Sequence, residues 1–146
     1  MQEVHEMRVH FKDRWEAGRL LAEELAGNGV EDGVVLAIPR GGVPVAVEVA
    51  DRIGAELGLT IPRKLPVPGN AEAGFGAVSE DGALALNDLL LNHLRLREDE
   101  IERIAARVRE DIKRRKEIFM ERISQPDVEG RRVILVDDGI ASGYTM

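Results

Sequence analysis

The sequence predicts an α/β fold, with an open, mostly parallel sheet and flanking helices. Two short apolar runs, residues 34–38 and residues 133–136, are typical of strands buried on both faces of a parallel sheet. Segments with apolar residues at helical spacing separate these runs along the chain. The 146 residues suffice for one hydrophobic core, so we expect residues 1–146 to form a single domain.

The composition narrows the function classes. With 44% hydrophobic and 32% charged residues, the chain is too apolar for disorder. Its formal net charge of −7 repels polyanions, so we expect no nucleic-acid partner. The absence of cysteine excludes zinc–thiolate sites and is compatible with a reducing cytoplasm. No apolar run has the length of a membrane span, and residues 1–10 do not resemble a secretory signal, so we expect a cytoplasmic protein with no membrane partner.

The N-terminal part of the chain predicts a helix, a strand, a loop and a second helix. Asp13 can cap the first helix, which Gly27 ends. That helix would have Glu16 at the reciprocal capping position and an apolar face of Leu20, Leu21, Ala22 and Leu25. The strand at residues 34–38 is followed by the tight loop Pro39-Arg40-Gly41-Gly42. The second helix would place Val45, Val49, Ile53 and Leu57 at helical spacing.

The middle of the chain predicts more strands and a long helix. We expect a strand at residues 59–65, followed by a mobile loop at residues 66–78, which are rich in proline and glycine. Asp81-Gly82 is typical of a hairpin turn between two short strands. An amphipathic helix is expected at residues 98–123, with an apolar face of Ile101, Ile104, Ala105, Val108, Ile112 and Phe119.

The candidate site lies in the two loops that leave the buried strands, after Ile38 and after Val136, because parallel sheets bind ligands beyond the carboxyl ends of their strands. Asp137 and Asp138 are adjacent carboxylates that can accept hydrogen bonds from the two hydroxyls of a ribose. The small residues that follow allow backbone amides to surround a phosphate, with hydroxyl donors from Ser142 and Thr145. A solvated turn after a core strand is the simpler alternative.

Residues 133–145 resemble the thirteen-residue signature of type I phosphoribosyltransferases. That signature has four apolar residues, two acids, three variable positions, Ser or Thr, a small residue, a variable residue, and Ser or Thr; every defined position matches. The resemblance implies that Asp137 and Asp138 are the catalytic residues and hold the ribose hydroxyls of 5-phosphoribosyl-1-pyrophosphate (PRPP). The implied phosphoribosyl-binding residues are Asp137, Asp138, Gly139, Ile140, Ala141, Ser142, Gly143, Tyr144 and Thr145.

The same resemblance implies a pyrophosphate site in the first loop. In that family a short turn after the first core strand binds pyrophosphate, which assigns this role to Arg40, Gly41 and Gly42. Arginine can fork onto phosphate oxygens, and glycine permits close backbone approach and positive φ. Arg63 and Lys64 are assigned to pyrophosphate by the same resemblance, and residues 66–78 would be the mobile hood loop that closes over the site. The alternatives are an ordinary strand-to-helix turn and a solvated strand end.

The implied reaction transfers ribosyl-5-phosphate from PRPP to a small nitrogenous acceptor, usually a nucleobase, and releases pyrophosphate. Such a glycosyltransferase would serve nucleotide salvage. Mg²⁺ is the implied cofactor, held mainly by substrate and water, with no direct protein ligand. The alternative is a regulatory module that binds PRPP or a nucleotide without transfer.

The remaining motifs predict structural roles. His5, His10 and His93 lack companions at metal-ligand spacing. The basic run at residues 113–116 is interleaved with acids, so we expect a solvated helix face rather than an RNA site. Because the resembled family continues with a further helix and strands, we expect a domain truncated at its C-terminus. Its open sheet edge would favour a homo-oligomer.

Overall fold

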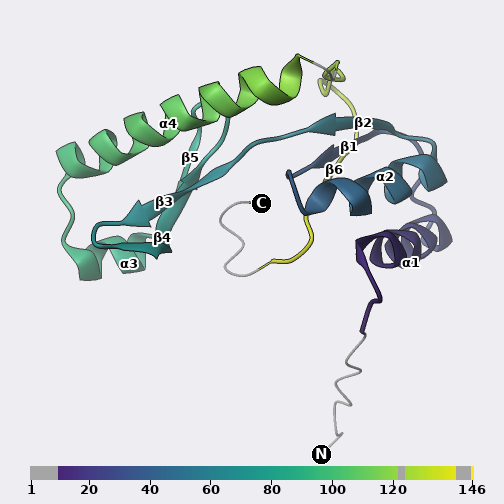
Figure 1. Ribbon diagram of the computed structural model, residues 1–146, viewed down its shortest axis with the longest axis horizontal. Helices are drawn as coiled ribbons and strands as arrows, with labels where there is room; N and C mark the ends of the chain where they lie inside the picture. The colour runs from purple at the N-terminus through teal and green to yellow at the C-terminus, as the bar shows by residue number, and fades with distance from the viewer. Residues whose placement is uncertain (1–9, 122–123, 141–145) are drawn as a thin grey trace, which may run out of the picture.

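The computed structural model describes residues 10–121, 124–140 and 146. Two groups of elements are visible in Figure 1, a parallel sheet with two helices and an antiparallel sheet with two more. In chain order the elements are α1 (Arg14–Gly27), β1 (Val34–Ala37), α2 (Gly42–Ile53), β2 (Glu56–Leu59), β3 (Arg63–Val67), β4 (Asn70–Val78), β5 (Leu84–Leu86), α3 (Asp88–Leu94), α4 (Glu98–Met120) and β6 (Val133–Val136). Among the described residues, no helix has both the length and the apolar character needed to cross a membrane.

The parallel sheet confirms the predicted fold class. Its strand order is β2-β1-β6, and both neighbours run parallel to the central strand β1. Val34, Val35 and Ala37 of β1 are fully buried, as the continuous apolar run predicted. Helix α2 packs on this sheet, and α1 packs on α2 (Figure 1).

Helix α1 begins as predicted but buries a different face. The Asp13 side chain accepts a hydrogen bond from the Glu16 amide at 2.8 Å. Leu20 and Leu21 are exposed, whereas Gly18 and Ala22 are buried. The predicted apolar face is therefore wrong in part. Gly18 explains the shift, because its lack of a side chain lets α2 pack closely against this face.

Helix α2 ends earlier than its apolar spacing predicted. Gly54 adopts a left-handed conformation with φ of 70° and caps the helix, so Leu57 lies in β2 instead of the helix. The spacing of Val45, Val49 and Ile53 was interpreted correctly. Leu57 occupies the next helical position but does not continue the helix, because Gly54 ends it in a left-handed conformation.

The predicted single strand at residues 59–65 is also wrong, because the chain changes sheets there. The Thr60 amide still donates to Ala37 of β1, but the Ile61 amide donates to the Glu80 carboxylate, and Pro62 has no N–H. The segment therefore contains the end of β2 and the start of β3, which belong to different sheets.

Residues 66–78 form regular structure, so the prediction that this stretch lacks it is wrong. Strands β3 and β4 pair as an antiparallel hairpin, with a register shift at Pro66. Gly76 lies inside β4, where a Cβ would overlap the Ala85 carbonyl oxygen of β5. The glycine therefore permits close strand pairing rather than flexibility. The predicted hairpin turn at Asp81-Gly82 is confirmed between β4 and β5.

Helix α4 connects the two parts of the molecule. Its predicted apolar face is confirmed, with Ala105 and Ile112 buried beside Leu65 and Phe75 of the antiparallel sheet. Near its C-terminal end, Phe119 packs against the core of the parallel sheet. The short helix α3 was not predicted; the Asn87 side chain caps it.

Two glycines of α1 provide a matched test of the α1–α2 contact. A Cβ at Gly18 would lie 2.9 Å from both Glu48 Cβ and the Val45 carbonyl oxygen, whereas a Cβ at Gly27 would meet nothing within 4 Å. We expect Gly18→Ala to destabilise the fold by about 1–3 kcal/mol through overpacking. We expect Gly27→Ala to be neutral or to stabilise by up to ~1 kcal/mol. Urea denaturation of both variants measures this, and equal effects would contradict the close packing of the helices.

Candidate active site

The two loops chosen from the sequence lie side by side in the structure. Because β1 and β6 are parallel neighbours with Ala37 paired to Val136, their following loops leave the same edge of the sheet. A Cβ at Gly42 would lie 2.6 Å from the Val136 carbonyl oxygen, and one at Gly41 would overlap the Asp138 carboxylate. Both loops can therefore touch only because glycine occupies these two positions.

The first loop is a tight turn between β1 and α2. The Pro39–Arg40 peptide bond is cis, and the Gly42 amide donates to the Ile38 carbonyl at 3.0 Å. Gly41 has φ of −63°, and neither loop glycine adopts positive φ. The close approach expected of these glycines is thus present, whereas the positive φ expected of them is not.

The acidic pair stands at the edge of the sheet with one oxygen of each carboxylate already bonded. Asp137 Oδ1 accepts from the Asp138 amide at 2.8 Å. Asp138 Oδ2 accepts from Arg14 Nε at 2.9 Å and Arg14 Nη2 at 2.7 Å. Within the described residues, no N–H group donates to Asp137 Oδ2 or Asp138 Oδ1, and the two side chains interact with each other. The pair therefore presents two oxygens that can accept from a ligand.

Burial raises the pKa of the Asp137 carboxyl above its ordinary value, and the neighbouring Asp138 carboxylate raises it further. The Asp138 amide, which donates to Asp137, opposes this rise. Asp137 is thus an acid whose charged form the fold does not favour. A positively charged or hydroxyl-bearing ligand would relieve that cost.

The acidic pair lines a cavity of about 440 Å³ between the sheet edge and α1. The N-terminal turn of α1 supplies Arg14, and the residues before it supply Phe11 and Asp13. No local pattern in the sequence indicates a site role for Arg14. Since Arg14 and Asp138 lie far apart in the sequence, only the packing of α1 reveals their contact.

The basic residues assigned to pyrophosphate divide into two groups. Arg40 lines a separate cavity of about 370 Å³ that also contains Asp111. Arg63 Nε lies 3.3 Å from Asp111 Oδ2, so Arg63 is paired with a carboxylate of the cavity that Arg40 lines. Lys64 is not part of this group, because its Nζ donates to the Glu72 carbonyl at 2.8 Å. Both Arg63 and Lys64 begin β3 rather than end a strand.

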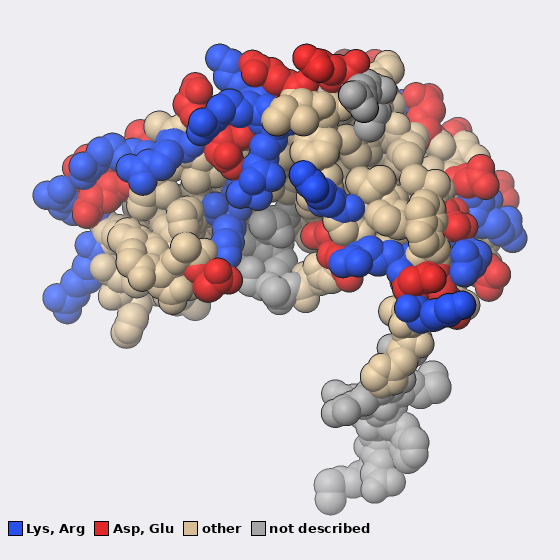
Figure 2. Space-filling view, in the orientation of Figure 1, with Lys and Arg blue, Asp and Glu red and all other residues tan. Residues whose placement is uncertain are grey.

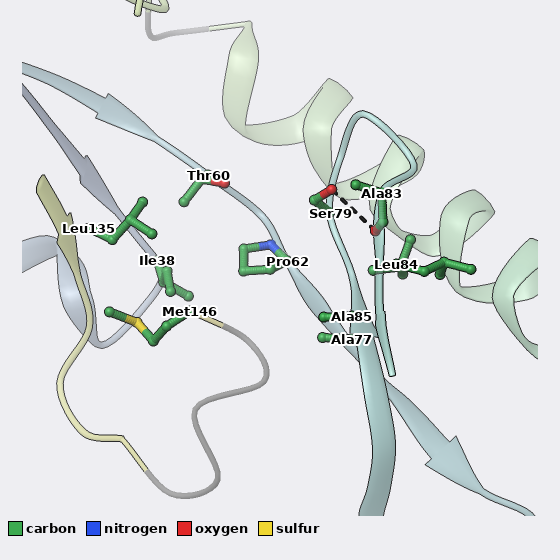
Figure 3. Close-up of a pocket in the computed structure, with 11 residues that line it drawn as sticks. Ile38, Thr60, Pro62, Ala77, Ser79, Ala83, Leu84, Ala85, Leu135 and Met146 are labelled. Carbon is green, nitrogen blue, oxygen red and sulfur yellow. Dashed lines mark hydrogen bonds between the residues drawn. The ribbon is translucent and has the colours of Figure 1, made fainter. Parts of the chain in front are cut away.

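A third cavity, of about 310 Å³, lies between the two sheets (Figure 3). Ile38, which directly follows β1, and Leu135 of β6 face it from one side, and Ala77 and Ala85 of the antiparallel sheet from the other. Its walls are mostly apolar, and it begins where β1 ends.

The predicted phosphate loop is described only at its start. Gly139 and Ile140 are exposed at the sheet edge. Ala141, Ser142, Gly143, Tyr144 and Thr145 lie outside the described residues, as does His5. Their roles remain predictions.

Comparison with known proteins supports the resemblance. No family model matches the chain. Two proteins of Mycobacterium tuberculosis, from strains CDC 1551 / Oshkosh and ATCC 25618 / H37Rv, are both named "Putative phosphoribosyl transferase" and are 42% identical over 135 residues. The match covers 92% of this chain but only 30% of each relative, so the chain spans under a third of their length.

A solved structure gives the same result for the fold. The crystal structure of TT1426 from Thermus thermophilus matches with 46% sequence identity and a TM-score of 0.77. That match covers 93% of this chain and 64% of the solved chain. Both the sequence and the fold thus have relatives over nearly the whole chain, and the chain's resemblance to the phosphoribosyltransferase family is confirmed.

Proposed function

We propose that this chain carries the PRPP-binding part of a phosphoribosyltransferase. In the proposed reaction, ribosyl-5-phosphate passes from PRPP to a nitrogen nucleophile, and pyrophosphate leaves. The observation that carries the proposal is the contact between the acidic pair and the glycine loop at one sheet edge, where Gly41 abuts Asp138. That edge is the usual ligand site of open parallel sheets.

The two remaining carboxylate oxygens of the pair suit the two hydroxyls of a ribose. Asp137 Oδ2 and Asp138 Oδ1 receive no bond from an N–H group of the described residues, and Arg14 holds Asp138 through its other oxygen. Hydrogen bonds to a carboxylate are about twice as strong as bonds between neutral groups. We propose that this pair anchors the ribose and supports the positive charge that develops on it.

The transfer breaks the bond from the anomeric carbon to a pyrophosphate oxygen and forms a bond to the acceptor nitrogen, whose proton goes to water. As in glycoside hydrolysis, the sugar acquires oxocarbenium-ion character. The Asp137 and Asp138 carboxylates would stabilise that cation, and Arg40 with the Gly41 amide would stabilise the departing anion, whereas the Gly42 amide is already bonded to the Ile38 carbonyl.

Mg²⁺ is compatible with this arrangement as a partner of the substrate. The described residues contain no group of three or more His, Asp and Glu side chains that could hold a metal. We propose that phosphate and water oxygens supply most of the ligands, which Mg²⁺ commonly accepts. When bound, it would neutralise part of the pyrophosphate charge.

We predict that PRPP binding depends on both acids. Asp137→Asn and Asp138→Asn each remove a charged acceptor, so each should weaken binding about tenfold or more. Titration calorimetry with PRPP and Mg²⁺ measures this, with Asp51→Asn as the matched control on an exposed turn of α2. Unchanged affinity in both site variants would contradict the assignment. PRPP binding without turnover across a panel of nucleobases would favour the regulatory alternative.

We predict that the same two variants change stability in opposite directions. The raised folded-state pKa of Asp137 means that its ionisation costs stability as pH rises above the ordinary value of 3.8. Asp137→Asn removes this cost, so it should stabilise the fold at pH 7, and the gain should shrink toward pH 4. Asp138→Asn weakens the Arg14 ion pair and should destabilise by about 0.2–1 kcal/mol. Urea denaturation at several pH values tests both signs; a destabilised Asp137→Asn at pH 7 would refute the first.

A further inference from the structure

The basic run of α4 divides into two residues that line a cavity and two that do not. Arg114 and Arg115 line the cavity of about 370 Å³ together with Arg40 and Asp111, whereas Lys113 and Lys116 are exposed and lie outside it. Figure 2 shows Lys and Arg side chains gathered along α4, with acidic side chains between them. The predicted solvated face therefore holds for the two lysines, while the two arginines also contribute to a cavity.

The arginines of this cavity are not neutralised. Asp111 Oδ2 is shared, since it lies 3.1 Å from Arg115 Nε and 3.3 Å from Arg63 Nε. In the described part of the chain, neither Arg40 nor Arg114 forms an ion pair or a side-chain hydrogen bond. Three arginines against one carboxylate leave a formal excess of two positive charges in the cavity. This excess matches a polyvalent anion.

The lining of the cavity also includes two apolar side chains. Ile118 and Phe119 of α4 complete it; Phe119 is half-buried, whereas Ile118 is 70% exposed, so the cavity is open to a ligand from solvent. Guanidinium groups are suited to phosphate because each can present two parallel N–H donors to it.

Two consecutive residues of the first loop connect the arginine cavity to the acidic pair. Gly41 faces the Asp138 carboxylate, while the side chain of the preceding Arg40 lies against α4. A group bound by Arg40 would therefore be held by the same turn that contacts Asp138. Helix α4 would complete its far side.

We infer that Arg40, Arg114 and Arg115 form a binding site for a diphosphate group between the first loop and α4. The inference adds Arg114 and Arg115 to Arg40, which the proposed function already assigns to pyrophosphate. It rests on the proposed function only in naming PRPP as the molecule that carries the diphosphate. Free inorganic pyrophosphate and the pyrophosphate of a sugar donor present the same chemistry to the arginines.

The test compares two double variants of equal charge. We expect Arg114→Gln with Arg115→Gln to weaken the binding of inorganic pyrophosphate about tenfold or more, because two charge-assisted contacts are lost. Lys113→Gln with Lys116→Gln removes the same charge outside the cavity and should change the affinity less than about twofold. Calorimetry at low salt measures both, and circular dichroism verifies that α4 remains folded. Equal weakening by the two pairs, or no pyrophosphate binding by the unmodified chain, would overturn the inference.

Two further arms separate this site from the proposed function. Asp138→Asn should lose PRPP affinity but keep pyrophosphate affinity, since Asp138 does not line the arginine cavity. Binding of pyrophosphate but not PRPP by the unmodified chain would refute the proposed function and leave the arginine site in place. If the double variant of Arg114 and Arg115 also weakens PRPP binding, the arginine cavity binds the pyrophosphate group of PRPP. Unchanged PRPP binding with weakened pyrophosphate binding would identify the free anion as the ligand.

Discussion

The parallel pairing of β1 with β6 is the constraint on which the candidate site depends. It joins Ala37 to Val136, residues far apart in the sequence, and thereby places two loops at one sheet edge. Backbone pairing alone does not complete the site, because the loops could not approach if Gly41 and Gly42 carried side chains. The register and the two glycines together set the position of Asp138 relative to the first loop.

The sequence predicted these central features because they leave local signals. A strand buried on both faces is a continuous apolar run, which is how β1 and β6 were found. The Asp13 cap and the turn at Gly82 are equally local. The acidic pair could be placed for the same reason, since it follows β6 directly.

The errors arose where one residue type serves two purposes. Gly76 was interpreted as a source of flexibility, but it permits β5 to approach β4. Leu57 matched the helical spacing, although Gly54 had already ended the helix. Contacts between distant segments left no local signal at all, which is why the ion pair of Arg14 with Asp138 emerged only from the position of α1 beside the sheet edge.

The distribution of charge explains how an acidic protein could select a phosphorylated ligand. A net charge of −7 repels such a ligand at long range, so bulk attraction cannot account for binding. Salt screens this repulsion beyond about 8–10 Å, whereas contacts inside a cavity are screened less. One turn of the first loop contacts the acidic pair through Gly41 and sends Arg40 toward the arginine cavity. A ligand with hydroxyls at one end and a diphosphate at the other would bind both the acidic pair and the arginine cavity. A simple polyanion would bind only the arginine cavity. Specificity would then come from the positions of the acidic pair and the arginine cavity on either side of the first loop, not from the net charge of the protein.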